Sequence, residues 1–173
     1  MPEVEKVDNE QFEPTILAFA CHWCTYSGAD LAGLNRMNYP ASVRVLRVPC
    51  SSRVSPQYIL SALNKGIDGV LVCGCHPGDC HYVSGNFYAK RRLMAFKRLL
   101  EYTGMEPERL QVRWISGSEA GKFRDLVIEV SEQIKELGPN PNKRSSLSRE
   151  VAVGASSGQT PDATQEQSQG GDA

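Results

Sequence analysis

The chain has 173 residues, which is enough for one domain with its own hydrophobic core and too few for two domains of ordinary size. Its formal net charge of −1 conceals a segregation, because acidic residues are in excess in residues 1–13 and 139–173 and basic residues are in excess between them. The basic surplus is too small to indicate nucleic-acid binding, so we expect no nucleic-acid partner. It fits a domain that docks acidic partners.

No apolar run of the chain is long enough to span a bilayer, and the N-terminus lacks the basic start and apolar core of a signal peptide. We therefore expect a cytoplasmic protein. In a reducing compartment, the six cysteines are expected to be metal ligands or redox thiols rather than structural disulfides.

The first part of the chain predicts three ordered elements behind a flexible acidic arm, which occupies residues 1–13. These elements are a strand, a helix and a second strand, at residues 15–20, 25–37 and 43–48. Gly28 weakens the helix, and its small size would let another part of the backbone approach closely.

The middle of the chain predicts a second helix and a third strand. Ser55-Pro56 is a good helix opening, with a capping residue followed by proline at the first helical position. Gly66 is typical of a helix end. Asp68-Gly69 is then expected to turn the chain into a continuous apolar strand that begins near Val70.

Two long helices flank a fourth strand, Leu110–Ile115, in the last part of the domain. The first helix is expected over Ser84–Thr103; its apolar face and its exposed basic face consist of Leu93, Phe96, Leu99 and Leu100, and of Lys90, Arg91, Arg92, Lys97 and Arg98. Five bases without an intervening acid indicate a docking patch, although a solvated helix surface is the ordinary interpretation. Ser116 and Glu119 have capping-box spacing before an apolar stripe that stops at Gly138.

This alternation of strands and helices predicts an α/β domain over residues 14–138, with a single open, mainly parallel four-stranded sheet flanked by helices, as in flavodoxin-like and Rossmann-like folds. The glycine-rich turn of a dinucleotide-binding protein is absent after the first strand, where Cys21-His-Trp-Cys24 stands instead. Residues 139–173 are rich in Ser, Gly and Gln and are expected to be a disordered tail.

All the cysteines lie at or beside the ends of three predicted strands. The first strand runs into Cys21 and Cys24, the second into Cys50, and the third into Cys73, Cys75 and Cys80. The carboxyl ends of parallel strands form the edge at which α/β sheets bind ligands, so we expect the thiols to converge there. Cys73 points to the same face as Cys75 but roughly 7 Å deeper, so it is the poorest candidate ligand.

Several thiolates that converge at one place suit an iron-sulfur cluster, zinc or copper. Cys21, Cys24, Cys50, Cys75 and Cys80 are five candidates for the four positions of a two-iron cluster. Neighbouring histidines, His22, His76 and His81, are expected to donate hydrogen bonds to sulfur or to face a partner, and Trp23 and Tyr82 to cover the site.

Two other interpretations remain open. The Cys21-X-X-Cys24 motif would suit a dithiol-disulfide oxidoreductase, although that leaves the other thiols unused. A zinc-stapled binding module is the second, although structural zinc usually serves domains that lack a core of this size.

Four segments in order resemble the delta subunit of methyl-viologen-reducing hydrogenase, an iron-sulfur protein family of anaerobes. The segments are Cys21–Asp30, Arg47–Arg53, Gly74–Tyr82, and Trp114–Ser116 with Glu119. The resemblance covers roughly residues 15 to 138. Cys73 departs from the pattern, in which glycine is expected, and the C-terminal tail is an addition.

The resemblance implies a single [2Fe-2S] cluster held by four of the five candidate cysteines. It also implies a non-catalytic subunit that relays electrons in anaerobic metabolism such as methanogenesis. The expected partners are a hydrogenase or formate dehydrogenase module on one side and the flavin-containing A subunit of a heterodisulfide reductase or similar complex on the other.

Overall fold

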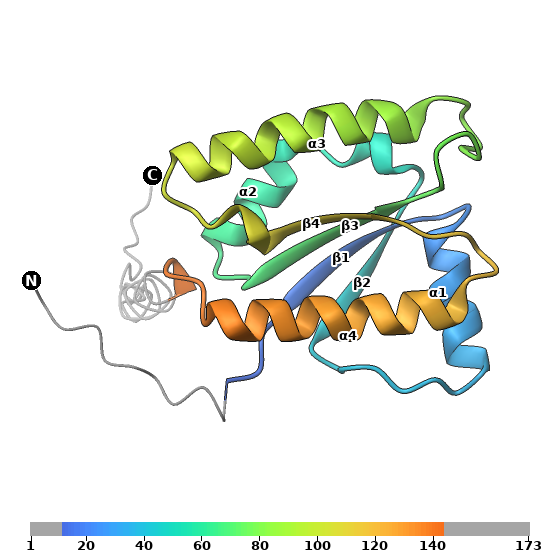
Figure 1. Ribbon diagram of the computed structural model, residues 1–173, viewed down its shortest axis with the longest axis horizontal. Helices are drawn as coiled ribbons and strands as arrows, with labels where there is room; N and C mark the ends of the chain where they lie inside the picture. Colours follow the sequence, from blue (N-terminus) through green and yellow to red (C-terminus); the bar gives the residue numbers. More distant parts are fainter. Residues whose placement is uncertain (1–11, 144–173) are drawn as a thin grey trace, which may run out of the picture.

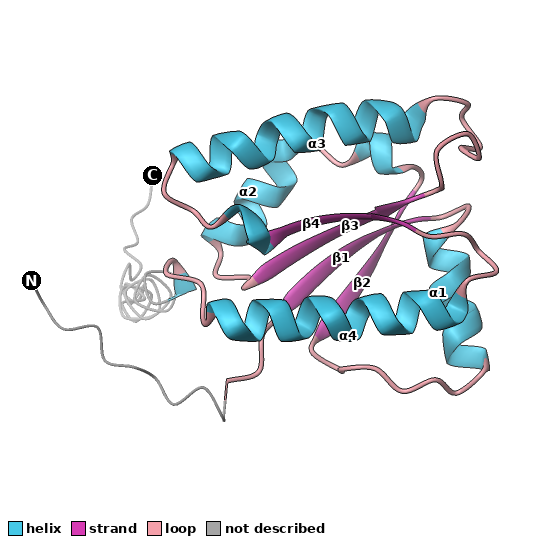
Figure 2. Cartoon of the chain, viewed as in Figure 1, coloured by secondary structure: helices cyan, strands magenta, loops and turns pink. Residues whose placement is uncertain are grey.

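The computed structural model describes residues 12–143, which form a four-stranded sheet with helices on both faces (Figures 1 and 2). The strands follow the spatial order β2-β1-β3-β4 and are β1 (Ile16–Cys21), β2 (Val43–Val48), β3 (Gly69–Gly74) and β4 (Leu110–Trp114). All three pairings are parallel. The predicted α/β fold is therefore confirmed.

Strand order follows from the apolar content of the strands. The central strands β1 and β3 are continuous apolar runs and are buried along almost their whole length, as a sheet covered on both faces requires. The edge strand β2 carries exposed arginines at Arg44 and Arg47. Charged side chains are tolerated there because an edge strand is only partly covered.

The helices divide evenly between the two faces of the sheet (Figure 1). Helices α1 (Thr25–Leu34) and α4 (Ala120–Leu137) cover one face, and α2 (Pro56–Asn64) and α3 (Gly85–Tyr102) cover the other. Two short 3-10 turns, η1 (Ser51–Arg53) and η2 (Pro107–Arg109), complete the chain order. Side chains of β3 alternate between the two cores, as strand geometry requires.

One helix signal of the sequence is confirmed on α2, and one on α3 is wrong. Ser55 accepts a hydrogen bond from the backbone N–H of Gln57 and so caps α2 as predicted. Leu93 and Leu100 of α3 are buried, but Leu99 is 54% exposed, so its predicted place in the core was wrong. A helix turns by about 100° per residue, which rotates Leu99 away from the stripe that contains Leu100.

The chain bends at Asp68 and enters β3 directly, as predicted. Gly69 is already the first residue of β3, and Asp68 is fully buried. A Cβ atom on Gly69 would lie 2.7 Å from Cγ1 of Ile134, so glycine at this position allows α4 to pack closely on the sheet. Small size, rather than turn geometry, explains this glycine.

The predicted capping box of α4 forms only in half. Glu119 Oε2 accepts a hydrogen bond of 2.7 Å from the backbone N–H of Ser116, while no side-chain bond caps the first turn of the helix. Glu119 itself occupies the N-cap position, so α4 begins at Ala120.

The ordered chain continues past the predicted domain end at Gly138. Asn140 is buried, and its side chain donates hydrogen bonds to the carbonyl oxygens of Leu63 and Ile67. The rest of the predicted tail and most of the predicted N-terminal arm, residues 144–173 and 1–11, lie outside the described residues. Within residues 12–143, none of the helices combines the length and apolar character needed to cross a membrane.

Candidate metal centre

The cysteines gather where the order of the strands reverses. From β1 the chain first crosses to β2 on one side and then returns to β3 on the other, so the switch point lies between β1 and β3. Cys21 is the last residue of β1, and Cys75 immediately follows β3. The crevice at such a switch point is where open α/β sheets bind ligands.

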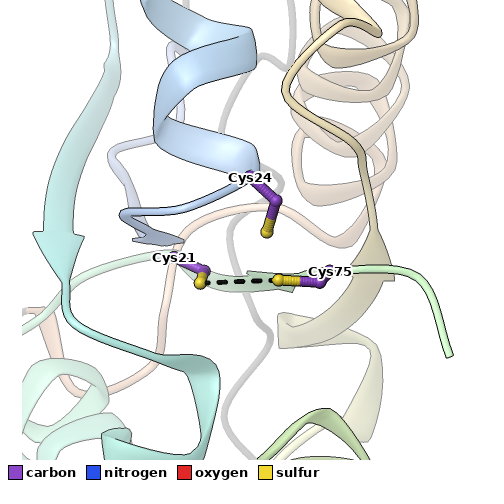
Figure 3. Close-up of side chains that lie close together, drawn as sticks. All are labelled: Cys21, Cys24 and Cys75. Atoms are coloured by element: carbon purple, nitrogen blue, oxygen red, sulfur yellow. Dashed lines mark hydrogen bonds between the residues drawn. The ribbon is translucent and has the colours of Figure 1, made fainter. Parts of the chain in front are cut away.

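Three thiols form a cluster at this crevice, which we call the cysteine trio: Cys21, Cys24 and Cys75 (Figure 3). Their sulfur atoms all lie within 4.8 Å of one another, and all three residues are buried. Cys24 points from the start of α1 toward the other two. The Sγ atoms of Cys21 and Cys75 are 3.8 Å apart, close to the separation of about 3.8 Å for two thiolates bound tetrahedrally to one metal ion.

The trio favours one thiolate. A hydrogen bond from Cys24 lowers the pKa of Cys21 to about 5, with further help from the backbone N–H groups of Trp23 and Ser51. The same bond raises the pKa of Cys24, because that thiol supplies the proton. Burial raises the pKa of Cys75 to about 11. Binding of a metal ion would displace the remaining protons, since thiolates are the ligands.

Cys50 and Cys80 form a second group, which we call the cysteine pair. Their Sγ atoms are 4.0 Å apart, and both residues are buried. The backbone at Gly85, the first residue of α3, packs against both sulfurs. A Cβ atom there would lie 2.6 Å from the Sγ of Cys50 and 3.1 Å from that of Cys80.

The chain segments that carry the pair also contact the trio. The carbonyl oxygen of Pro49, next to Cys50, lies 3.9 Å from the Sγ of Cys21. The backbone N–H of His81, next to Cys80, favours the ionised form of the Cys75 thiol and so acts to lower its pKa. Pair and trio therefore adjoin, and five thiols from three strand ends line one region.

Cys73 lies apart from the other cysteines, among the core residues between the sheet and helices α1 and α4. It is fully buried, and burial raises the pKa of its thiol to about 12. Its exclusion from metal binding stays a prediction, which this position supports.

The three histidines have different surroundings. His76 Nε2 lies 2.7 Å from Oε2 of Glu119, whose pKa is lowered to about 2, first by the Ser116 N–H and then by His76. His81 stacks on Trp23 with ring centroids 3.7 Å apart. The Nδ1 atom of His22 is buried without a hydrogen-bond partner among the described residues, so a donor or acceptor beside Cys21 is still unused.

Sequence reasoning missed two residues that hold the site together. Asn86 is buried, and its side-chain NH₂ donates to the carbonyl oxygens of Cys75 and His76. Gly85 provides the space for the cysteine pair. The adjacent Gly and Asn at the predicted start of a helix were a usable signal, because neither residue type favours a helix interior.

The donor set fits an iron-sulfur cluster. Such clusters are held by cysteine thiolates in a largely protein-enclosed site, and hydrogen bonds to the sulfurs set their potential. Buried thiols that adjoin backbone N–H groups meet these conditions. Four ligands are needed, and the five cysteines of the trio and pair exceed that number by one.

Comparison with known proteins assigns the chain to a family. The family described as "Methyl-viologen-reducing hydrogenase, delta subunit" matches residues 16–138. The iron-sulfur D subunit of the F420-non-reducing hydrogenase of Archaeoglobus profundus is 52% identical over 131 residues, which cover 76% of this chain and 96% of that protein. The vhc iron-sulfur D subunit of the F420-non-reducing hydrogenase of Methanococcus voltae is 49% identical over 130 residues, covering 75% and 90%.

A relative of another kind contains the matching region within a much longer chain. The A subunit of the ferredoxin:CoB-CoM heterodisulfide reductase of Methanosarcina mazei is 44% identical over 126 residues, which are 73% of this chain and 16% of that protein. The match to the family extends from the first residue of β1 to the end of the last described helix and includes all the cysteines of the site. The chain belongs to the family of methyl-viologen-reducing hydrogenase delta subunits.

Proposed function

We propose that this chain is an iron-sulfur electron-transfer subunit that holds one [2Fe-2S] cluster. In this role it relays electrons between a hydrogenase or formate dehydrogenase module and the A subunit of a heterodisulfide reductase or similar complex. The observation that carries the proposal is the convergence of Cys21, Cys24, Cys50, Cys75 and Cys80 from three strand ends on one edge of the sheet. The names of the relatives support a hydrogenase and a heterodisulfide reductase as partners, whereas a formate dehydrogenase module rests on the family resemblance alone.

The cysteine pair and two members of the trio are the proposed ligands. Cys50 and Cys80 supply one side of the site, since their sulfurs are 4.0 Å apart and no third cysteine of residues 12–143 shares their position. Two of Cys21, Cys24 and Cys75 supply the other side, and the third remains a neighbouring thiol. When bound, such a cluster takes up and releases single electrons.

The chain itself prepares the site for negatively charged sulfur. Backbone N–H groups of Trp23, Ser51 and His81 face the sulfurs of Cys21 and Cys75 and stabilise their thiolate forms. The first turn of α3 lies against the cysteine pair, where the positive end of the helix dipole favours anions. Burial excludes water from the sulfurs.

Protein purified without oxygen tests the cluster directly. We expect a brown protein with about two irons and two sulfides per chain and an electron paramagnetic resonance signal on reduction. Colourless protein with stoichiometric zinc would favour the zinc-stapled module and overturn the proposal. Co-purification from the source organism tests the partners separately.

One observation favours a second candidate, a dithiol-disulfide oxidoreductase. The pKa of Cys21 is lowered to about 5 by Cys24, and a depressed pKa in a Cys-X-X-Cys motif is typical of a thiol that attacks disulfides. Metal-free protein with a reversible disulfide between these two residues would support it. This function leaves Cys75 unused although its sulfur is 3.8 Å from that of Cys21.

A further inference from the structure

Exposed aromatic and aliphatic side chains gather beside the cysteine site. They belong to Cys-X-X-Cys, to the turn after Cys80 and to the first turn of α3, and we call them the apolar cap: Trp23, Tyr82, Val83, Phe87 and Tyr88. The indole N–H of Trp23 donates a hydrogen bond to the Tyr82 hydroxyl, which joins two of these segments. Large apolar residues that cluster on a surface mark an interaction site more often than isolated ones do.

Val83 is the most unusual member of the apolar cap. It is 82% exposed and has a φ of 65°, in the left-handed region that β-branched residues avoid. The turn is closed by a 2.8 Å hydrogen bond from the Val83 N–H to the Cys80 carbonyl oxygen. Asparagine or glycine would adopt this backbone with less strain, so folding alone does not explain valine here.

Basic side chains border the apolar cap on α3. No acidic residue occurs between Gly85 and Leu100, and Lys90, Arg91 and Arg98 are exposed. None of these three bases forms an ion pair with another described residue. Phe87, Tyr88, Lys90 and Arg91 line a shallow hollow of about 350 Å³. An apolar centre with a cationic border fits a partner surface with apolar side chains bordered by carboxylates.

The apolar cap is linked to the cysteines through the backbone. Asn86, between Gly85 and Phe87, donates hydrogen bonds to the carbonyl oxygens of Cys75 and His76. The Val83 N–H donates a hydrogen bond to the Cys80 carbonyl oxygen, which closes the turn between the two residues. A protein docked on the cap would therefore lie over the site, so the distance between that protein and the cysteines would be short. Electron transfer requires such a short distance.

Two relatives contain the matching domain within a much longer chain. The M. mazei protein and a similar one from Methanosarcina acetivorans, both named as the A subunit of a heterodisulfide reductase, contain the matching domain within 16% of their length. In those proteins the domain and the remainder of the chain are one polypeptide, so the two parts are held together permanently.

We propose that the apolar cap and its basic border, Lys90 and Arg91, are the docking surface for the A subunit of a heterodisulfide reductase, which would present apolar side chains and carboxylates to it. This inference rests on the proposed electron-transfer function and adds the location of the contact. The hydrogenase or formate dehydrogenase module then binds elsewhere on the domain.

Binding to the full-length A subunit from the source organism tests the surface, with the complete chain purified without oxygen as the analyte. Val83→Asn relieves the backbone strain and removes the apolar side chain. We expect the melting temperature to rise and the affinity to fall about tenfold or more, as for a residue central to an interface. If Val83 had a purely structural role, the melting temperature and the affinity would not change in opposite directions.

A charge-reversal variant, Lys90→Glu with Arg91→Glu, tests the basic border. We expect slower association and a weaker dependence of binding on salt concentration. Lys135→Glu, an exposed base on α4 on the opposite face of the sheet, is the matched control and should leave both unchanged.

Two results would overturn the docking surface. The first is unchanged affinity for the A subunit in both variants, and the second is lost binding to the hydrogenase module while the A subunit still binds. The absorption spectrum of each variant is recorded in parallel. Loss of docking with an unchanged cluster spectrum supports this inference, whereas wild-type protein that carries no cluster refutes the proposed function instead.

Discussion

Gly85 has no side chain, and the space that one would fill is taken by two sulfur atoms. A Cβ atom at this position would lie 2.6 Å from the Sγ of Cys50, a distance that real side chains do not reach. The cysteine pair is therefore possible only because α3 starts with glycine. Glycine is not needed here for its conformational freedom, because the φ angle of Gly85 is not positive.

We expect Gly85→Ala to lower iron occupancy severalfold, because the added methyl group must displace Cys50 or Cys80. Iron and sulfide content of protein purified without oxygen provides the measurement. Gly121→Ala is the matched control: apart from its chain neighbours and the nearby backbone of its own helix, no atom lies within 4 Å of its Cβ position in the first turn of α4, and alanine there should stabilise the helix by about 1 kcal/mol. Normal iron content in Gly85→Ala would show that the two sulfurs can move apart freely.

Alanine substitutions of individual cysteines distinguish metal ligands from core residues. Cys73→Ala should keep the cluster and destabilise the fold by only about 1 kcal/mol, because Cys73 is a small buried side chain in the core. Cys50→Ala and Cys80→Ala should each abolish the visible absorption, and at most one of the three trio variants should retain it. Loss of iron in Cys73→Ala would contradict the separation of this residue from the site.

At the scale of elements, a buried polar network holds the edge of the sheet opposite the cysteines, which is the edge where the strands begin. The Asp68 carboxylate accepts hydrogen bonds from the backbone N–H groups of Thr15 and Asn140 and from Lys143. The Arg109 guanidinium donates to the carbonyl oxygens of Asp68 and Gly138. The network joins the start of three strands to the segment that follows α4.

Asp68→Asn should destabilise the domain by about 2–3 kcal/mol, because an amide cannot accept all three hydrogen bonds and leaves buried donors unpaired. Urea unfolding monitored by circular dichroism measures the change. Asp125→Asn on the exposed side of α4 is the control and should cost less than about 0.5 kcal/mol. Equal effects of the two substitutions would mean that the network contributes no more than a surface ion pair.

Asn86 has the corresponding role at the cysteine edge, where it joins α3 to the segment after β3. In Asn86→Ala the carbonyl oxygens of Cys75 and His76 lose their buried donor, which should cost about 1–3 kcal/mol. We also expect iron to be released to a chelator several times faster, since Cys75 is less firmly held. An unchanged release rate would restrict Asn86 to a structural role in α3.

At the scale of the whole molecule, the two edges of the sheet are stabilised by different means. The Asp68 edge is held by hydrogen bonds within the protein, whereas the cysteine edge brings together thiols that, as thiolates without a metal, would repel one another. Binding of metal to a site that the unfolded chain lacks adds to folding stability. Stability of the cysteine edge should therefore depend on the cluster.

Removal of the cluster should lower the melting temperature and increase amide hydrogen exchange mainly in Cys21–Thr25, Cys50–Arg53 and Cys75–Gly85. Exchange of the strand starts around Asp68 should change little, because that network needs no metal. Mass spectrometry of exchange in loaded and cluster-free protein makes the comparison. Uniform loss of protection over all strands would show that the domain unfolds as one unit.

The sequence alone determined the elements, their parallel arrangement and the edge at which the cysteines lie. Apolar runs and helical periodicity are local properties, and the order of strands and helices restricts the topology. The conclusion that five cysteines follow three strand ends needed only the chain order. Four short segments were also enough to identify the family resemblance that the comparisons confirm.

Only the tertiary structure decided how the cysteines group and which residues support them. The division into a trio and a pair depends on loop conformations within a few ångströms, and no periodicity encodes them. The same holds for Asn86 beneath Cys75 and for the buried Asp68, which the sequence assigned to a turn. Contacts between residues far apart in the chain are set by packing and hydrogen-bond geometry in three dimensions, and a local pattern in one segment does not specify its partner in another.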